Sequence, residues 1–530
     1  MWEDEQPSCT HPGLPREPIF QGDYAFNTGH VRKFGVVDFV FFGLTLVIST
    51  IIGFYHGWRN LSNMSTEEYF TASHSMHPLP VCLSLSASFF SGVTLVAIPV
   101  EVYNYSTMNF WAGTNFVIAI AAAAYIFIPL FYQLKTVSCF QYLEMRFCRE
   151  IRSICSTMYI LYMIAYLSFC LSGPSIAVSH VTGIDIFWST IAIGFVCSIY
   201  TAVGGMRAVI WTDTFQIVVS LIGVLVLLIR CMMAVGGIGV VWESALRTNR
   251  IRFADFRTDP ALSNTFWSIV IGMSTIYLSY GFNQSQVMRS QACRSVQEAQ
   301  WAVVGNIPGL CFIFFTSCFI GLYMSTLYEN CDPVKASFVH HPSQISSLLA
   351  MDVLGDTAGL PGLFIAGVVS ATLSSMSSGL NSLAAVAVED YVKIYFYSQI
   401  RTDQAQLFSQ IVSVFFGAII FELNHYISGH AHLRYAALSV ISLTTAPLTG
   451  VFLLGILIPQ CNLTGAWTGL LGCILIEIVI FVGKKKASPM ALPDKALTCV
   501  SNCNLTAFSN ASISSLLKLK RPPSPLSSIP

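Results

Sequence analysis

Long apolar runs, separated by short polar, charged or Gly/Pro-containing breaks, dominate the pattern along this chain. About twelve of them approach the roughly 20 residues that a helix needs to cross a hydrocarbon core of about 30 Å. The first spans 34–55, and the others begin near Leu79, Phe110, Ile154, Phe187, Phe215, Phe266, Val303, Leu360, Phe408, Ala436 and Gly465. Because the runs are continuous rather than alternating, they predict membrane helices and disfavour a β-barrel.

The composition agrees with this pattern. Hydrophobic residues make up 54% of the chain, charged residues 10%, and the mean hydropathy is +0.64. These values exclude an ordinary soluble protein. The formal net charge is zero, so no basic excess points to nucleic acid. The sequence therefore predicts an all-α, polytopic protein whose main partner is the lipid bilayer.

Catalytic and metal-binding patterns do not emerge from the sequence. We find no Ser/His/Asp or metal-ligand cluster in a suitable setting and no phosphate loop, so an enzyme is not expected. Most of the sixteen cysteines lie in apolar runs as small hydrophobic residues. Cys499 and Cys503 differ, because they lie in a polar tail beside sequons at Asn504 and Asn510. These asparagines are candidates for glycosylation, and the tail suits an oxidising exterior.

Lys and Arg in the short connections favour an outside N-terminus. In that orientation six face outward and ten face the cytoplasm: Arg59, Lys135, Arg146, Arg149, Arg152, Arg207, Arg289, Arg294, Lys393 and Arg401. Lys484, Lys485 and Lys486 would then lie outside, against the positive-inside tendency. No Lys or Arg is expected near the middle of any span. We expect residues 1–33 to be the outer N-terminal segment, and 484–530 to be a polar, disordered tail.

A stripe of hydroxyl groups from Ser370 to Ala384 interrupts the apolar run that begins at Leu360. In a helix its members share one face. They are Ser370, Ser374, Ser377 and Asn381, with Ala371, Ser375, Ser378 and Ser382 beside them. Such oxygens suit a small hard cation. Close packing of small residues explains the stretch equally well, so both interpretations stay open here.

The second run is rich in serine, glycine and threonine between Leu83 and Thr94. Such a span can break in the middle of the membrane, which exposes carbonyl groups on one half and N–H groups on the other. A serine- and glycine-rich stretch is more often a helix-packing face, so this signal alone is weak.

Several longer motifs resemble the sodium:solute symporter family. They are the stretches Tyr200–Asp213, Gly359–Ala366 and Leu373–Asn381. The stretches 99–103, 141–147 and 280–287 further resemble the branch that holds the iodide, multivitamin and monocarboxylate transporters. The resemblance covers roughly Val36–Trp467.

The resemblance implies a LeuT-like transporter domain at 34–483, built from two inverted five-helix repeats. On this chain the repeats would span 79–235 and 266–458, after a leading helix at 34–55 and before a final helix at 465–483. No internal repetition is visible in the sequence, so this symmetry depends on the resemblance alone.

The resemblance also implies a sodium site. Its ligands would be the carbonyls of Ala87, Phe90 and Ala371 and the hydroxyls of Ser374 and Ser375. Ser377 and Ser378 match positions implicated in a second sodium in some members, and Asp213 matches an aspartate along the sodium pathway. From physics alone, Asp213 could equally be a carboxylate that complements the dipole at a helix N-terminus.

An anionic substrate would have to be held by helix N-termini, hydroxyls and sodium, which fits a small monovalent anion but not a di- or triphosphate. Substrate contacts are expected at Ser91, Gly92, Val93, Thr94, Tyr280, Asn283 and Gln284. The motif around Thr94 resembles that of monocarboxylate carriers, which have a threonine at this position, whereas the iodide branch has an amide side chain there.

The expected function is sodium-driven symport of a monocarboxylate such as lactate, pyruvate, a short-chain fatty acid or nicotinate, by alternating access in the cell membrane. One alternative keeps the symporter and changes the cargo to biotin, pantothenate or iodide. A further alternative is a sodium-gated sensor or channel that does not transport a solute.

Overall fold

The computed structural model describes residues 23–59, 66–134, 136–259, 262, 264–396, 402–429, 431–486, 496, 498 and 503. Throughout these residues the regular secondary structure is helical, apart from an isolated bridge between Met76 and Cys293. The expected all-α class is therefore confirmed. Cys499, Asn504 and Asn510 lie outside the described residues.

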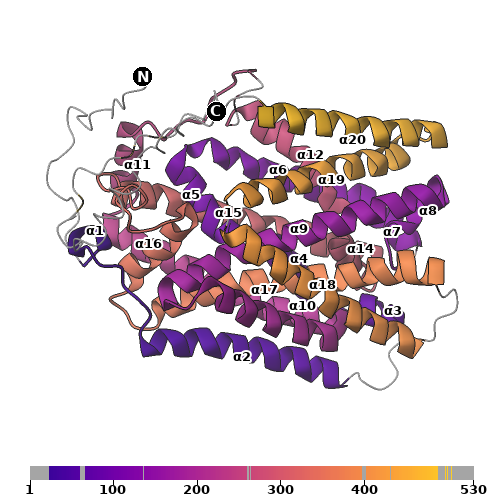
Figure 1. The fold of residues 1–530 in the computed structure, drawn as a ribbon, viewed down its shortest axis with the longest axis horizontal. Coiled ribbons are helices and arrows are strands. Elements are labelled where there is room, and N and C mark those ends of the chain that lie inside the picture. Colours follow the sequence, from indigo (N-terminus) through magenta and orange to yellow (C-terminus); the bar gives the residue numbers. More distant parts are fainter. Residues whose placement is uncertain are drawn as a thin grey trace, which may run out of the picture.

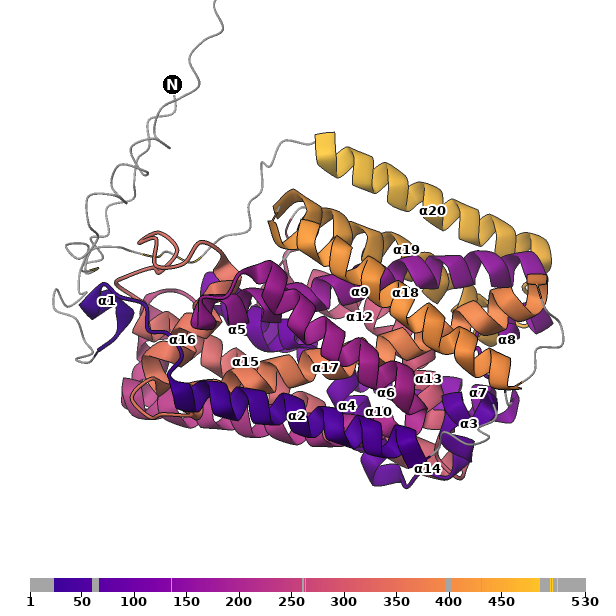
Figure 2. The same ribbon diagram turned by 60° about the horizontal axis from the view of Figure 1, so that its bottom comes forward.

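Long helices run side by side along the longest axis of the molecule (Figure 1). They are α2 (Val36–Arg59), α9 (Arg149–Thr182), α10 (Ile186–Val235), α15 (Asn306–Leu327), α17 (Leu360–Ala387), α18 (Thr402–Gly429), α19 (Ala431–Leu457) and α20 (Leu463–Lys486). In Figure 1 α2 and α20 lie on opposite edges, and in Figure 2 they again lie on opposite sides of the bundle.

Shorter helices complete the bundle. They are α1 (Ala25–Thr28), α3 (Thr66–Thr71), α4 (Pro78–Phe89), α5 (Gly92–Asn104), α6 (Ala112–Ala122), α7 (Ile128–Leu134), α8 (Gln141–Arg146), α11 (Ile238–Arg247), α12 (Met273–Leu278), α13 (Gln284–Gln291), α14 (Val296–Val304) and α16 (Ile345–Leu354). Short π-helical segments join α6 to α7, precede α12 and extend α17 as Val388–Phe396.

The described part of the chain contains nine helices that are long and apolar enough to cross a membrane, and the bent pair α4–α5 makes a tenth. The other two expected spans are also helical. One is the apolar stretch Ile186–Ser198, which precedes a kink at Gly205, where φ is 60°. The other is the interrupted run from Trp267 to Gln291. The chain is thus a multi-pass membrane protein.

The serine-rich helix α17 lies at the centre of the bundle. In its most apolar stretch 94% of the residues are buried, compared with 11% in α20. It packs extensively against α10 and also contacts α2, α4, α5, α9, α13 and α18. The helix that carries the expected hydroxyl stripe is therefore surrounded by other helices of the bundle.

The break expected in the second span is present. Helix α4 starts at Pro78 and ends at Phe89, and α5 starts at Gly92 at an angle of 54° to α4. Ser91 caps α5, because its hydroxyl accepts a hydrogen bond from the Thr94 amide at 3.4 Å. The polar stretch therefore forms a break and also contributes to packing.

The last described residues are fastened to segments that are distant in the sequence. We call Ala496, Thr498 and Cys503 the C-terminal strap. Cys503 forms a disulfide with Cys331, and the Ala496 amide donates to the Asn104 carbonyl at 2.8 Å. The Thr498 carbonyl accepts from Lys335 Nζ at 2.8 Å. The strap thus fastens the tail to the end of α5 and to the connection between α15 and α16.

The strap predicts the side on which the tail lies. Asn104 and Cys331 both follow spans that are expected to end outside, so an epitope tag added after Pro530 should be labelled by antibody on intact cells. A tag in the connection 397–401 should need permeabilised cells. Labelling of the C-terminal tag only after permeabilisation would contradict this orientation.

A buried carboxylate fixes α1 against the same end of the bundle. Asp352 accepts hydrogen bonds from the Ala25 amide at 3.0 Å and from the Tyr328 hydroxyl at 2.7 Å. Burial raises the pKa of Asp352 to about 7, although both hydrogen bonds oppose this shift. The folded protein therefore binds a proton here at pH values where the unfolded chain has lost it.

This linkage predicts a pH-dependent stability. Because the folded pKa lies above the unfolded value, the stabilising contribution is complete below about pH 4 and is lost as pH rises to about 7. Asp352→Asn should remove this dependence. We expect the melting temperature of the wild type, relative to that variant, to fall by about 2–4 °C between pH 5 and pH 8. A constant difference across this range would contradict the assignment.

Candidate functional site

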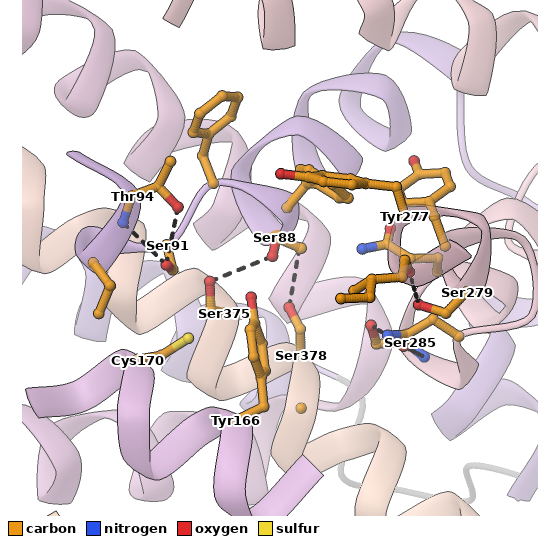
Figure 3. A pocket seen from close by; sticks show the side chains of 18 of the residues that line it. Ser88, Ser91, Thr94, Tyr166, Cys170, Tyr277, Ser279, Ser285, Ser375 and Ser378 are labelled. Atoms are coloured by element: carbon orange, nitrogen blue, oxygen red, sulfur yellow. Dashed lines mark hydrogen bonds between the residues drawn. The ribbon is translucent and has the colours of Figure 1, made fainter. Parts of the chain in front are cut away.

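A cavity of about 260 Å³ lies beside the break between α4 and α5. Its walls come from α4–α5, α6, α9, the segment from α12 to α13, α15 and α17. Figure 3 shows how hydroxyl groups from three of these walls point toward one another. The cavity is lined by Ser88, Phe89, Phe90, Ser91, Val93, Thr94, Ile98, Phe116, Tyr162, Met163, Tyr166, Phe169, Cys170, Ile276, Tyr277, Ser279, Tyr280, Asn283, Ser285, Gln286, Phe314, Ser375, Ser378 and Gly379.

The lining has two chemically different parts and no charged side chain. Serine and threonine hydroxyls from α4–α5 and α17 form one part, which we call the hydroxyl floor. It consists of Ser88, Ser91, Thr94, Ser375 and Ser378. Aromatic rings form most of the remainder. The cavity can therefore offer hydrogen bonds at one end and apolar contact at the other.

Phe89 organises the aromatic part. Its ring centroid lies 5.3 Å from those of Phe116 and Tyr280, both in edge-on geometry. On the α9 side, the rings of Tyr162 and Tyr166 stack with their centroids 5.8 Å apart. These arrangements are favourable for aromatic pairs and hold the walls in place.

The expected sodium ligands lie on α17 and at the break between α4 and α5, and the two segments are in contact through Ser375. The Ser375 hydroxyl donates to the carbonyls of Ser88 at 3.3 Å and Ala371 at 3.2 Å. Ser374 Oγ is buried without a hydrogen-bond partner among the described residues. Because α4 ends at Phe89, carbonyls in its last turn, including that of Ala87, lack helical partners. The buried Phe90 continues with extended backbone.

The residues expected at a second sodium also lie on this face of α17. Ser378 Oγ lies 3.1 Å from Ser88 Oγ, and the Ser377 hydroxyl donates to the Ser374 carbonyl at 3.1 Å. Asp213 is fully buried and accepts a hydrogen bond from the Ser84 hydroxyl at 2.6 Å. It lies well inside α10, past the Gly205 kink, so the helix N-terminus interpretation is wrong.

One basic residue corrects the sequence analysis. Arg289 was expected in a cytoplasmic connection, but it lies in α13, fully buried, and pairs with Asp213 at 3.0 Å. The expected place of Arg289 in a connection is therefore wrong. It does not lie near the middle of a span, because its helix ends at Gln291. The stretch around Arg289 is polar, as connections between spans usually are. The carboxylate that pairs with Arg289 belongs to a distant segment, so the sequence does not show that the charge is buried.

Most of the expected substrate residues line the cavity. Ser91, Val93, Thr94, Tyr280 and Asn283 contribute to its walls. Asn283 also caps α13, where its amide oxygen accepts from the Ser285 amide at 3.1 Å.

Two expected residues are used elsewhere. Gly92 packs against α17 and Pro174 rather than lining the cavity. Gln284 accepts a hydrogen bond from the Cys139 amide at 2.8 Å and donates to the Val137 carbonyl.

Sequence reasoning missed the aromatic walls. Phe116, Tyr277 and Phe314 come from three separate segments, and nothing in the sequence pattern links them. On α9, the spacing of Tyr162, Tyr166 and Cys170 places all three on one helix face. That stripe was a usable signal.

The sodium:solute symporter family model matches residues 69–472. The chain is 37% identical to the human sodium-coupled monocarboxylate transporter 1, over 90% of this chain and 78% of that protein. It is 36% identical to the human sodium/iodide cotransporter, over 90% and 75%.

The structure also resembles a substrate-bound, outward-open Na⁺-coupled sialic acid symporter. The TM-score is 0.75 at 22% sequence identity, with 85% of this chain and 93% of that chain covered. This likeness establishes the LeuT-like fold. The family model and the two human relatives, which match over most of the length, show that the chain belongs to the sodium:solute symporter family.

Proposed function

We propose that this protein couples the movement of sodium down its gradient to the uptake of small monocarboxylates. The observation that carries the proposal is a cavity of about 260 Å³ without charged lining residues, whose hydroxyl floor includes Ser375, the neighbour of Ser374 in the chain. A carboxylate can contact these hydroxyls while its carbon chain faces the aromatic rings. A relative of 37% identity is named for the same cargo.

The chemistry of the lining argues against several other solutes. A di- or triphosphate needs arginine clamps, and the lining offers no cationic side chain. Thr94, whose hydroxyl lies 3.3 Å from that of Ser91, belongs to the floor, as expected for a monocarboxylate carrier. Iodide has no apolar portion that would need the aromatic walls.

For sodium, we assign the first site to the carbonyls of Ala87, Phe90 and Ala371 and the hydroxyls of Ser374 and Ser375. An ion there would bridge the broken span to α17. A second ion would be held by Ser377, Ser378 and Asp213. Sodium binding would then favour one arrangement of the break, and alternating access would release ion and substrate together. The membrane potential contributes about 2.3 kcal/mol per charge per 100 mV.

The test is uptake by cells that express the protein, with labelled pyruvate, nicotinate, biotin and iodide, in sodium and in choline. We expect sodium-dependent uptake of pyruvate and nicotinate, each reduced by an excess of the other. If only biotin or only iodide is taken up in a sodium-dependent way, that solute is the cargo and the monocarboxylate proposal is wrong. Sodium-evoked current without accumulation of any solute would indicate a sensor or channel instead.

A further inference from the structure

A fully buried ion pair lies directly behind the hydroxyl floor. Arg289 and Asp213 are both completely shielded from solvent, and their closest nitrogen and oxygen atoms are 3.0 Å apart. A buried guanidinium without a carboxylate is strongly disfavoured, as is the carboxylate alone. The two charges therefore depend on each other.

The guanidinium joins four helices. Its Nε donates to Ser84 Oγ on α4 at 2.7 Å, and Nη1 donates to the Ser285 carbonyl on its own helix at 2.9 Å. Nη2 donates to Asp213 on α10 and to Ser378 Oγ on α17. The positive charge of Arg289 thus contacts two of the groups that would hold a second sodium ion.

The surrounding oxygens retain unused capacity. Asp213 Oδ2 accepts from Ser84, Ser88 and Arg289. Asp213 Oδ1 is buried and makes no hydrogen bond of normal geometry in the described residues, although the carboxylate contacts the Ser374 hydroxyl. Ser374 Oγ is in the same situation. A carboxylate oxygen and a hydroxyl are ligands that sodium accepts. The pocket around Asp213 can therefore serve a guanidinium or a metal cation.

We propose that Arg289 is a tethered competitor for the second sodium ion. Its guanidinium and the ion share Asp213 and Ser378, and two cations around one carboxylate repel each other. Sodium therefore binds at this position only by displacing the guanidinium from Ser378. This inference deepens the proposed function and depends on the second sodium position assigned there.

Displacement has a structural consequence, because Arg289 is carried by α13, whose residues Ser285 and Gln286 line the cavity. The same guanidinium holds α4 through Ser84. Release of Arg289 would loosen both helices from α10 and α17. Occupancy of the second position is thereby coupled to the position of the helices below the substrate.

The test measures binding of radioactive sodium to the purified protein, without substrate. In Arg289→Gln the competitor is gone while Asp213 stays. We expect the second ion to bind at a sodium concentration at least about tenfold lower than in the wild type. Arg289→Lys keeps the charge but cannot form the four-helix hydrogen-bond fork. Its sodium curve should stay within about threefold of the wild type.

Unchanged or weaker sodium binding in Arg289→Gln would overturn the proposal. An equal increase of sodium affinity in Arg289→Gln and Arg289→Lys would also overturn it, because the hydrogen bonds of Arg289 rather than its charge would then oppose the ion. Should Arg289→Gln fail to fold, Asp213→Asn/Arg289→Gln removes both charges. It should bind one sodium ion fewer than the wild type, and an unchanged number would overturn the proposal. Sodium binding without uptake of monocarboxylates would refute the proposed cargo alone.

Discussion

Replacing Ser374 and Ser375 together by alanine is expected to raise the sodium concentration for half-maximal uptake by about tenfold or more, equivalent to about 1.4 kcal/mol. The variant lacks two of the five proposed ligands of the first ion. Among the described residues Ser374 Oγ makes no hydrogen bond of normal geometry, and its contact is with the Asp213 carboxylate. The measurement is uptake of labelled pyruvate against sodium concentration, normalised to protein at the cell surface.

Ser370→Ala is the matched control. Ser370 lies on the same helix one turn earlier, is equally buried, and its hydroxyl also lacks a partner among the described residues. The Ser370→Ala variant also loses a buried serine hydroxyl, but Ser370 does not belong to the proposed site. The sodium dependence of its uptake should therefore match the wild type. An equal response of the control and the double variant would mean that α17 tolerates no change of packing, and the ion-site assignment would fail.

Gly92→Ala is expected to impair transport strongly. A Cβ at this position would overlap Thr372 Oγ1 and would lie 2.5 Å from Pro174 Cγ and from the Val368 carbonyl oxygen. Since two of these neighbours belong to α17 and one is backbone, α5 would have to move away from the central helix. Overpacking of this kind costs about 1–3 kcal/mol or more. We expect uptake to fall by at least about tenfold.

The control for this change is Gly43→Ala in α2, where an added Cβ meets no atom within 4 Å. That variant should reach the surface and transport as the wild type does. Surface amount and uptake should be measured separately for both variants. Normal uptake by Gly92→Ala would show that α5 and α17 are not packed as closely as the structure describes.

The helical spans could be predicted because the thickness of the bilayer sets their length, and each span appears in the sequence as one apolar run of about that length. The break after Phe89 was also readable, since serine and glycine replace larger apolar residues there. The face of α17 that carries Ser374 and Ser375 follows from helical periodicity. Each of these features depends on residues that are close together in sequence.

The remaining features depend on contacts between distant segments. An aromatic residue in an apolar run can face lipid or protein, so the sequence could not place Phe116 or Phe314 at a cavity. Arg289 looked like a residue of a cytoplasmic connection, because its partner Asp213 is 76 positions away. The pairing of Cys503 with Cys331 likewise spans 172 positions.

That disulfide closes a covalent ring around the second half of the protein. The ring runs from Cys331 through α16, α17, α18, α19 and α20 to Cys503. A single proteolytic cut in any connection inside the ring, such as 397–401, would leave one covalently continuous molecule, which separates into two fragments only after reduction. The helix that carries Ser374 and Ser375 would therefore stay linked to the rest of the transporter even when its own chain is interrupted.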